Sequence, residues 1–198
     1  MSKRELMILE QELEIRDSTE TTPATISGYA IRFNTVTEIG GYFRELVRPE
    51  AIKDGIQGAD IRALWNHNSD MPLGRTKNGT LALEKDAQGL RFTVTPPDTS
   101  WGRDALESVK RGDVSGMSFG FYTNKERWTE EKDKTPLREL LDIELLEVFP
   151  VTFPAYPTTT AQARSAEEIL AEMPQKQSST DVNIAQMRNR LKIKELEV

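Results

Sequence analysis

One histidine and one glycine-flanked serine are the residues of this sequence best suited to acyl-transfer chemistry. His67 is the only histidine among the 198 residues, so any histidine base in this protein must be this residue. Ser118 lies in the segment GDVSGMSFGF, residues 112–121. A serine is a weak nucleophile at neutral pH and needs a base within hydrogen-bond reach, which a third group usually orients. Ser118 and His67 therefore form the first candidate pair.

The segment around Ser118 is expected to be a strand whose two faces differ. Strand alternation makes one face bulky and mostly apolar, with Ser115, Met117, Phe119 and Phe121. The opposite face is nearly bare, with Val114, Gly116, Ser118 and Gly120. Glycine weakens a strand unless another group must approach the backbone there. We therefore expect Gly116 and Gly120 to leave room for a substrate strand beside Ser118.

A carboxylate on a second expected strand, residues 140–149, is the candidate third group. Strand alternation places Glu147 on the same face as four apolar residues, Leu141, Ile143, Leu145 and Phe149. A carboxylate is costly to bury unless it is paired, so Glu147 is expected to pair with His67. Asp142 and Glu144, on the other face, are the alternatives if the register of the strand differs.

The elements that must position these groups are mostly strands. Residues 61–67 are predicted to form a core strand that ends at His67, followed by turn residues at 68–72. Further strands are expected at residues 24–33, 42–47, 80–85 and 90–96, and a hairpin turn at 86–89. Residues 48–55 read as a short helical piece and residues 99–111 as a helix, with Asp98, Thr99 or Ser100 as its N-cap and Gly112 after its end.

Two parts of the chain are less regular. Residues 4–16 fit a helix by propensity and a strand by alternation, and the local sequence does not decide between them. Residues 125–136 are expected to form a charged, mobile loop. Beyond residue 158, helices are expected at 163–173 and 184–198, with a polar disordered segment at 174–181.

Composition excludes several classes of site. The chain has no cysteine, which excludes disulfides and thiolate metal sites, and a single histidine argues against structural zinc, so no metal and no cofactor are expected. A net charge of −6 argues against general nucleic-acid binding. No apolar run reaches the roughly 20 residues that cross a bilayer, so we expect a soluble, non-secreted protein without membrane contact.

Three blocks, in order and spacing, resemble the prohead (procapsid maturation) serine proteases of tailed bacteriophages, which look like distant relatives of the herpesvirus assemblins. The first block is WNHN at 65–68 with PLGR at 72–75, the second is RGDVSGMSFGF at 111–121, and the third is LLEVFPVTFPA at 145–155. The similarity spans roughly residues 24–165. Three ordered blocks are far more specific than any one of them.

The resemblance implies a fold class that is mostly β with flanking helices (α+β), built on an assemblin-like β-barrel core. It implies an N-terminal segment at 1–23, a protease domain at 24–165, and a flexible or helical tail at 166–198 that self-cleavage removes. It also implies an endopeptidase that cuts major capsid protein and scaffold segments inside the assembling prohead, in the host cytoplasm. Because assemblins act as dimers, a homodimer or higher oligomer is implied too.

Carried over by position, the resemblance makes His67 the general base and Ser118 the nucleophile. Assemblins use a second histidine as the third member, which this chain lacks. An acidic residue of the strand at 141–149 must replace it. No Arg-Arg pair of the assemblin kind follows the serine, so backbone N–H groups near Ser118 or an ordered water would have to stabilise the oxyanion. The alternative function is a non-enzymatic capsid-assembly or scaffold module on the same fold.

Overall fold

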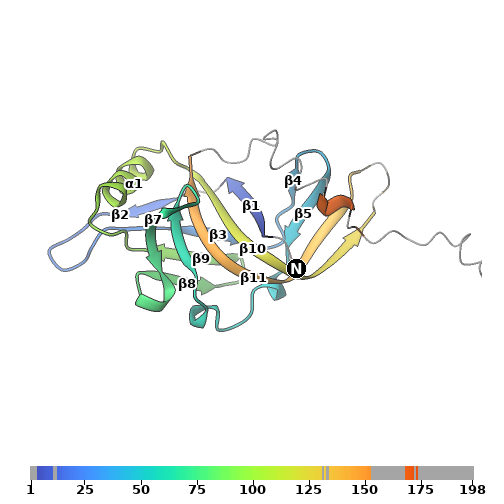
Figure 1. The fold of residues 1–198 in the computed structure, drawn as a ribbon, viewed down its shortest axis with the longest axis horizontal. Coiled ribbons are helices and arrows are strands. Elements are labelled where there is room, and N and C mark those ends of the chain that lie inside the picture. The colour runs from blue at the N-terminus through green and yellow to red at the C-terminus, as the bar shows by residue number, and fades with distance from the viewer. Residues whose placement is uncertain are drawn as a thin grey trace, which may run out of the picture.

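The computed structural model describes residues 4–10, 13–130, 132, 134–152, 168–171 and 173. Within these residues the chain is mostly β-structure, as predicted (Figure 1). The strands are β1 (Glu5–Glu10), β2 (Glu14–Arg16), β3 (Thr25–Arg32), β4 (Thr37–Ile39), β5 (Phe43–Val47), β6 (Arg62–Trp65), β7 (Asn68–Arg75), β8 (Leu81–Lys85), β9 (Gly89–Val94), β10 (Gly116–Thr129) and β11 (Leu137–Val151). The helices are α1 (Ser100–Lys110) and three short 3₁₀ turns, η1 (Pro49–Ala51), η2 (Ile56–Gly58) and η3 (Thr76–Asn78).

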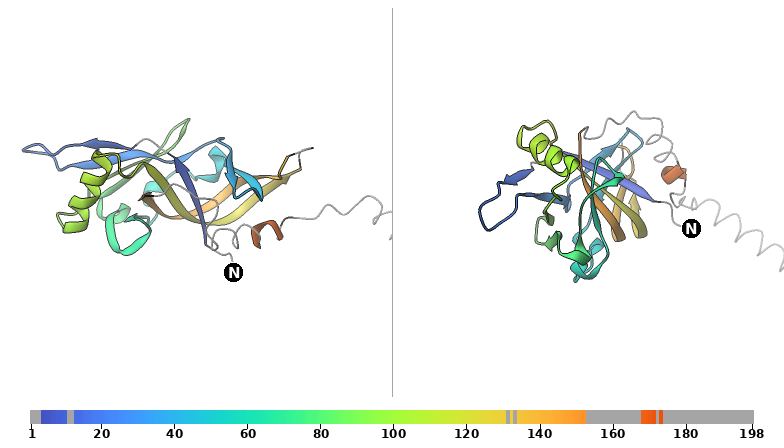
Figure 2. Two further views of the ribbon diagram at one scale, coloured as in Figure 1. Left: turned by 90° about the horizontal axis from the view of Figure 1, so that it is seen from above. Right: turned by 60° about the vertical axis from the view of Figure 1, so that its left-hand side comes forward.

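The strands form two sheets. The larger has the order β1-β10-β11-β5-β4, and β6 also pairs with β11 while β7 pairs with β6. The smaller has the order β2-β3-β9-β8. The two long strands β10 and β11 are antiparallel and cross the molecule from the end near α1 to the far side of β5, as Figures 1 and 2 show.

Both sheets contribute to one apolar core. Side chains of the smaller sheet, such as Ile26 and Phe92, belong to the same buried cluster as Met117, Phe119 and Phe121 of β10. The bulky face predicted for the segment around Ser118 is therefore the core face of β10. Helix α1 packs at one end, begins at Thr99, whose side chain accepts a hydrogen bond from the Gly102 amide, and matches the helix predicted from the sequence.

Most predicted strands are confirmed, and the ambiguous N-terminal segment is resolved as β-structure. Residues 4–16 contain β1 and β2, which belong to different sheets. Three predictions are wrong. The strand expected to end at His67 ends at Trp65, and Asn66 and His67 form the turn after it. Residues 68–72, expected to be a turn, begin strand β7, and residues 125–129, expected to be a loop, continue β10.

The side of β11 from which Glu147 projects also differs from the prediction, because β11 carries a bulge. Gly120 pairs with Glu147 but the next residue of β10, Phe121, pairs with Leu145, so Leu146 is the extra residue. One extra residue reverses which side the following side chains face. Val148 therefore joins Leu145 in the main core, whereas Phe149 belongs to a second small cluster with Leu64 and Val151. Glu147 and Phe149 do not share a face with Leu145.

A buried ion cluster ties β1 into the larger sheet. Arg138 of β11 is only 3% exposed and donates to Glu5 of β1, to Glu45 of β5 at 2.8 Å and to Glu126 of β10 at 2.6 Å. Burial raises the pKa of Glu45 to about 7, although the charge of Arg138 acts to lower this pKa. Three carboxylates thus share one guanidinium at the centre of the sheet.

The expectations for the C-terminal tail fall mostly outside the described residues. Residues 168–171 form a helical turn within the helix expected at 163–173, and the segments at 174–181 and 184–198 are not described. Among the described residues, no helix is both long and apolar enough to span a lipid bilayer.

Candidate active site

Strands β10 and β11 bring two of the three predicted site residues onto one face of the larger sheet. Ser118 lies opposite Phe149, and Gly120 lies opposite Glu147, in the antiparallel register. Directly opposite residues of an antiparallel pair project to the same side, with Cβ atoms about 5 Å apart. Ser118 and Glu147 therefore project from the side of the sheet that faces away from the main core.

The imidazole of His67 lies over the same face. Its ring stacks on the Phe149 ring, with centroids 4.9 Å apart and planes inclined by 29°. Its Nδ1 atom contacts the Glu147 carboxylate. Because Phe149 is the strand partner of Ser118, the structure gathers the predicted serine, histidine and glutamate on one face.

A tight hairpin turn presents His67. Trp65 and Asn68 are strand partners, so Asn66 and His67 are the two residues of the turn between β6 and β7. Both have positive φ, 50° and 60°, as a type I′ turn requires. A non-glycine residue in this region costs about 1–3 kcal/mol and persists only where its surroundings hold it in place.

The tip of this hairpin is tied to the end of β11. The side-chain amide nitrogen of Asn66 donates to Oγ1 of Thr152 at 3.0 Å. The Thr152 backbone N–H donates to the side-chain oxygen of Asn66 at 2.9 Å. The Asn66 backbone N–H donates to the Pro150 carbonyl at 3.1 Å. These bonds hold the turn beside the strand that carries Glu147.

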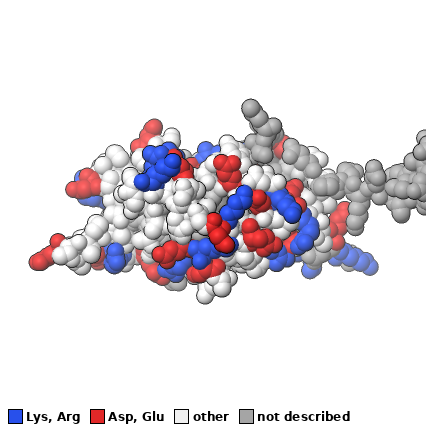
Figure 3. Space-filling model, turned by 90° about the horizontal axis from the view of Figure 1, so that it is seen from below, with Lys and Arg blue, Asp and Glu red and all other residues white. Residues whose placement is uncertain are grey.

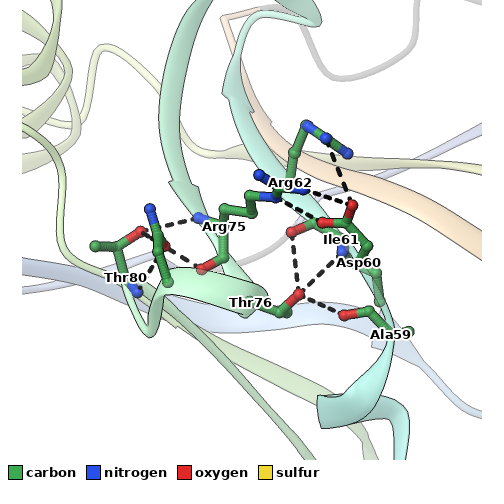
Figure 4. A network of polar contacts seen from close by, with 8 residues as sticks. Ala59, Asp60, Ile61, Arg62, Arg75, Thr76 and Thr80 are labelled. Carbon is green, nitrogen blue, oxygen red and sulfur yellow. Dashed lines mark hydrogen bonds and ion pairs between the residues drawn. The ribbon is translucent and has the colours of Figure 1, made fainter.

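The base of the hairpin is closed by a second set of contacts, shown in Figure 4. Arg75 donates two hydrogen bonds to the Asp60 carboxylate, at 2.6 and 2.7 Å, and these bonds lower the pKa of Asp60 to about 2. The Thr76 hydroxyl accepts a 3.0 Å hydrogen bond from the Ile61 backbone N–H. With both ends fixed, the hairpin is a rigid support for His67.

The hydroxyl of Ser118 is turned toward the N-terminal strand. Ser118 is fully buried, and its Oγ donates a 2.8 Å hydrogen bond to the backbone carbonyl of Met7 in β1. Among the residues that the structure describes, Ser118 has no hydrogen bond to His67. The hydroxyl is therefore paired with an amide oxygen in this conformation.

Arg4 is a residue of the site that the sequence analysis missed. Its Nη2 atom lies 3.4 Å from His67 Nδ1 and makes an ion-pair contact with Oε1 of Glu147. That buried oxygen therefore lies against both Arg4 and His67. No local sequence signal could have found Arg4, because it reaches the site only through the pairing of β1 with β10.

The bare face of β10 is filled by side chains in this conformation. A Cβ atom on Gly120 would lie 3.0 Å from Cγ of Glu147 and 3.3 Å from Nε of Arg4. Gly116 lies between its strand partners Glu10 and Val151. The substrate-binding role of Gly116 and Gly120 stays a prediction, and Gly120 is needed here to admit Glu147.

The two alternative carboxylates lie elsewhere. Asp142 accepts a 3.2 Å hydrogen bond from Asn124 and pairs with Lys53 at 3.2 Å, and the Asn124 hydrogen bond lowers its pKa. Glu144 is exposed, opposite Tyr122. Within the described part of the chain, only Glu147 of these three acids contacts His67.

Charge is distributed without a dominant sign on the face drawn in Figure 3, where lysine and arginine side chains alternate with aspartate and glutamate. In the described ranges, no group of three or more histidine, aspartate or glutamate side chains is placed to hold a metal ion. What the site does contain is a hydroxyl, an imidazole and a carboxylate. These are the three kinds of group that make up a serine–histidine–acid triad.

Comparison with known proteins gives a family match over most of the chain. Residues 11–174 match the family described as caudovirus prohead serine protease. The prohead protease of Enterobacteria phage HK97 is 28% identical over 123 residues, which cover 60% of this chain and 51% of that protein. The chain thus matches about half the length of this relative.

A solved structure supports the fold. The capsid assembly protease of bacteriophage T4 superposes with a TM-score of 0.53 and 12% sequence identity. The match covers 75% of this chain and 98% of the T4 chain. At this identity the likeness concerns the fold alone.

Proposed function

This chain belongs to the family of caudovirus prohead serine proteases, and from that premise we propose that it is a serine endopeptidase of prohead maturation. Ser118 is the nucleophile, His67 the general base and Glu147 the acid that orients the imidazole. The observation that carries this assignment is the contact of His67 with Glu147 on the sheet face from which Ser118 projects.

The reaction is an acyl transfer in two stages. His67 accepts the Ser118 proton while Oγ attacks a peptide carbonyl carbon, and the same proton then passes to the leaving amine as the C–N bond breaks. Water hydrolyses the acyl ester, with His67 again as base. Glu147 stabilises the imidazolium in each stage and holds the proton on Nδ1, which leaves Nε2 free to act as the base.

The names of the relatives support the choice of substrate. One is a prohead protease and another a capsid assembly protease. We therefore infer that the substrates are major capsid protein and scaffold segments, and that cleavage takes place inside the assembling prohead. The protease domain comprises residues 24–165, and the enzyme removes residues 166–198 from itself. Intact-mass spectrometry of protein recovered from assembling shells tests this: finding only full-length chain would refute self-cleavage.

Substitution of the nucleophile tests the assignment directly. Ser118→Ala should abolish cleavage of co-expressed major capsid protein, because it removes only the attacking oxygen. The matched control is Ser115→Ala, since Ser115 is an exposed serine three positions away, and this variant should cleave like the unsubstituted chain. Circular dichroism of both variants checks that the fold is retained.

The result can also favour the other candidate function. Undiminished cleavage by Ser118→Ala would refute the role of Ser118. If the unsubstituted chain neither cleaves capsid protein during assembly nor reacts with a fluorophosphonate, a non-enzymatic assembly module on this fold is the better description.

A further inference from the structure

The N-terminal strand occupies the one edge of β10 that β11 leaves open. β1 runs antiparallel to β10, with Ile8 opposite Ser118 and Leu6 opposite Gly120. Figure 1 shows β1 beside β10, on the side away from β11. An open strand edge at a protease nucleophile is a natural place for an extended peptide to bind, through main-chain hydrogen bonds. Here a segment of the same chain fills that place.

This segment also contacts each of the three proposed catalytic groups. The carbonyl of Met7 accepts the hydrogen bond of the Ser118 hydroxyl at 2.8 Å. Arg4 contacts the Glu147 carboxylate and lies 3.4 Å from Nδ1 of His67.

Each contact opposes the proposed chemistry. A carbonyl oxygen is not a base that can take the serine proton. Arg4 Nη2 lies 3.4 Å from Nδ1, and an arginine N–H can only donate, so Arg4 cannot hold a proton on Nδ1 as a carboxylate can. In the proposed reaction the proton must be on Nδ1, held by Glu147, so that Nε2 can act as the base. Arg4 also competes with His67 for the same carboxylate oxygen.

Two of the described side chains of β1 anchor the strand. Met7 is buried in the core and Glu5 joins the Arg138 ion cluster, where it also accepts a 2.7 Å hydrogen bond from Thr123. Leu6, on the other side of the strand, is 42% exposed. The family match begins at residue 11, after β1 has ended. β1 therefore lies outside the segment that this chain shares with the family description.

We propose that the edge of β10 is a binding site for an extended peptide strand and that β1 is its exchangeable occupant. Substrate pairs with β10 at Ser118 only when β1 leaves, and departure of β1 also removes Arg4 from His67 and Glu147. The effect of this exchange on cleavage rests on the proposed function, but the exchange of strands itself can be measured without catalysis.

The test uses the full chain and the variant Glu5→Ala. This change removes one anchor of β1 and leaves Arg138 paired with Glu45 and Glu126. The change removes the hydrogen bonds that Glu5 accepts from Arg138 and Thr123. We expect hydrogen–deuterium exchange of the β1 amides to accelerate by about tenfold or more, since loss of even one charge-assisted hydrogen bond shifts an opening equilibrium by about tenfold. Labelling of Ser118 by a fluorophosphonate should accelerate by a similar factor. Glu14→Ala, which removes an exposed glutamate of β2, is the matched control and should change neither rate.

A synthetic peptide with the sequence of residues 4–10 completes the experiment. Added to Glu5→Ala, it should protect the amides at 116–121 from exchange and slow the labelling again, whereas a scrambled peptide should do neither. If Glu5→Ala leaves β1 exchange unchanged, Glu5→Ala with Met7→Ser, which also removes the apolar anchor, is measured in the same way.

The outcomes separate the two proposals. Three results would overturn the exchangeable occupant: β1 exchange that stays unchanged in both variants, labelling that is detectable but no faster when β1 exchange is faster, or no protection of the amides at 116–121 by the peptide. If no variant is ever labelled but the peptide still protects β10, the binding site stands and the protease assignment fails.

Discussion

The carboxylate of Glu147 is the point at which the candidate site can be switched between two arrangements, because it contacts both His67 and Arg4. With His67 as its partner, it fixes the tautomer that a general base needs. With Arg4 as its partner, it neutralises a cation that has no part in the chemistry. The role of Glu147 is therefore best tested by removing its charge while keeping its shape.

Glu147→Gln should reduce peptide cleavage by about 10³–10⁴-fold, because an amide at this position favours the wrong imidazole tautomer. The unfolding midpoint should change little by comparison. Initial rates of capsid-protein cleavage measure the effect. Glu144→Gln is the matched control, since Glu144 is exposed on the same strand, and it should keep full activity. A larger loss in Glu144→Gln would show that the third member has been misassigned.

At the scale of elements, the β6–β7 hairpin determines where the imidazole lies. Asn66 contributes to this in two ways, through its left-handed backbone and through its side-chain bonds to Thr152. Asn66→Gly removes only the side-chain bonds, whereas Asn66→Ala also places a Cβ atom in an unfavourable backbone region.

Asn66→Ala should therefore destabilise the protein by about 1 kcal/mol more than Asn66→Gly does. Urea unfolding at neutral pH measures both values. Both variants should also lower the cleavage rate, because the turn that presents His67 is no longer tied to β11. Equal destabilisation by the two substitutions would mean that the backbone of the turn is not strained.

An element can be predicted from the sequence when neighbouring residues determine it. Strands such as β3, β8 and β9 and the helix α1 were predictable because alternation and capping are written in consecutive residues. The pairing of Glu147 with His67 was predictable for a general reason, that a buried carboxylate needs a partner. The supporting argument was wrong, however, because it assumed unbroken alternation along β11.

The features that sequence reasoning missed are non-local. The bulge at Leu146 is visible only from the register between β10 and β11. Whether residues 4–16 form a helix or strands depends on a partner edge more than a hundred positions away, since β1 pairs with residues 116–121. Arg4 enters the site for the same reason. The pattern of neighbouring residues does not indicate which distant strand a segment pairs with.

At the scale of the whole molecule, the Arg138 cluster links four strands and makes stability depend on pH. Because burial raises the pKa of Glu45 to about 7, the folded protein keeps a proton on Glu45 that the unfolded chain releases near pH 4.5. The stabilisation from this group is complete below the unfolded value and is lost as the pH rises through about 7.

The free energy of unfolding should accordingly fall between pH 4.5 and 7 in the unsubstituted chain, relative to Glu45→Gln, which cannot ionise at this position. Urea unfolding at several pH values across this window measures the difference. Glu84→Gln, at an exposed position of β8, is the control and should follow the unsubstituted chain. Parallel pH profiles for Glu45→Gln and the unsubstituted chain would contradict the assignment.

The short connection between β1 and β2 has a consequence for how substrates compete. β1 ends at Glu10 and β2 begins at Glu14, so a released β1 stays tethered close to the edge it has left. Such a tether gives an effective concentration of about 1 mM or more. A peptide from another molecule must exceed this local concentration to remain bound. In dilute solution β1 would then keep the enzyme inactive. A high local concentration of substrate would start cleavage.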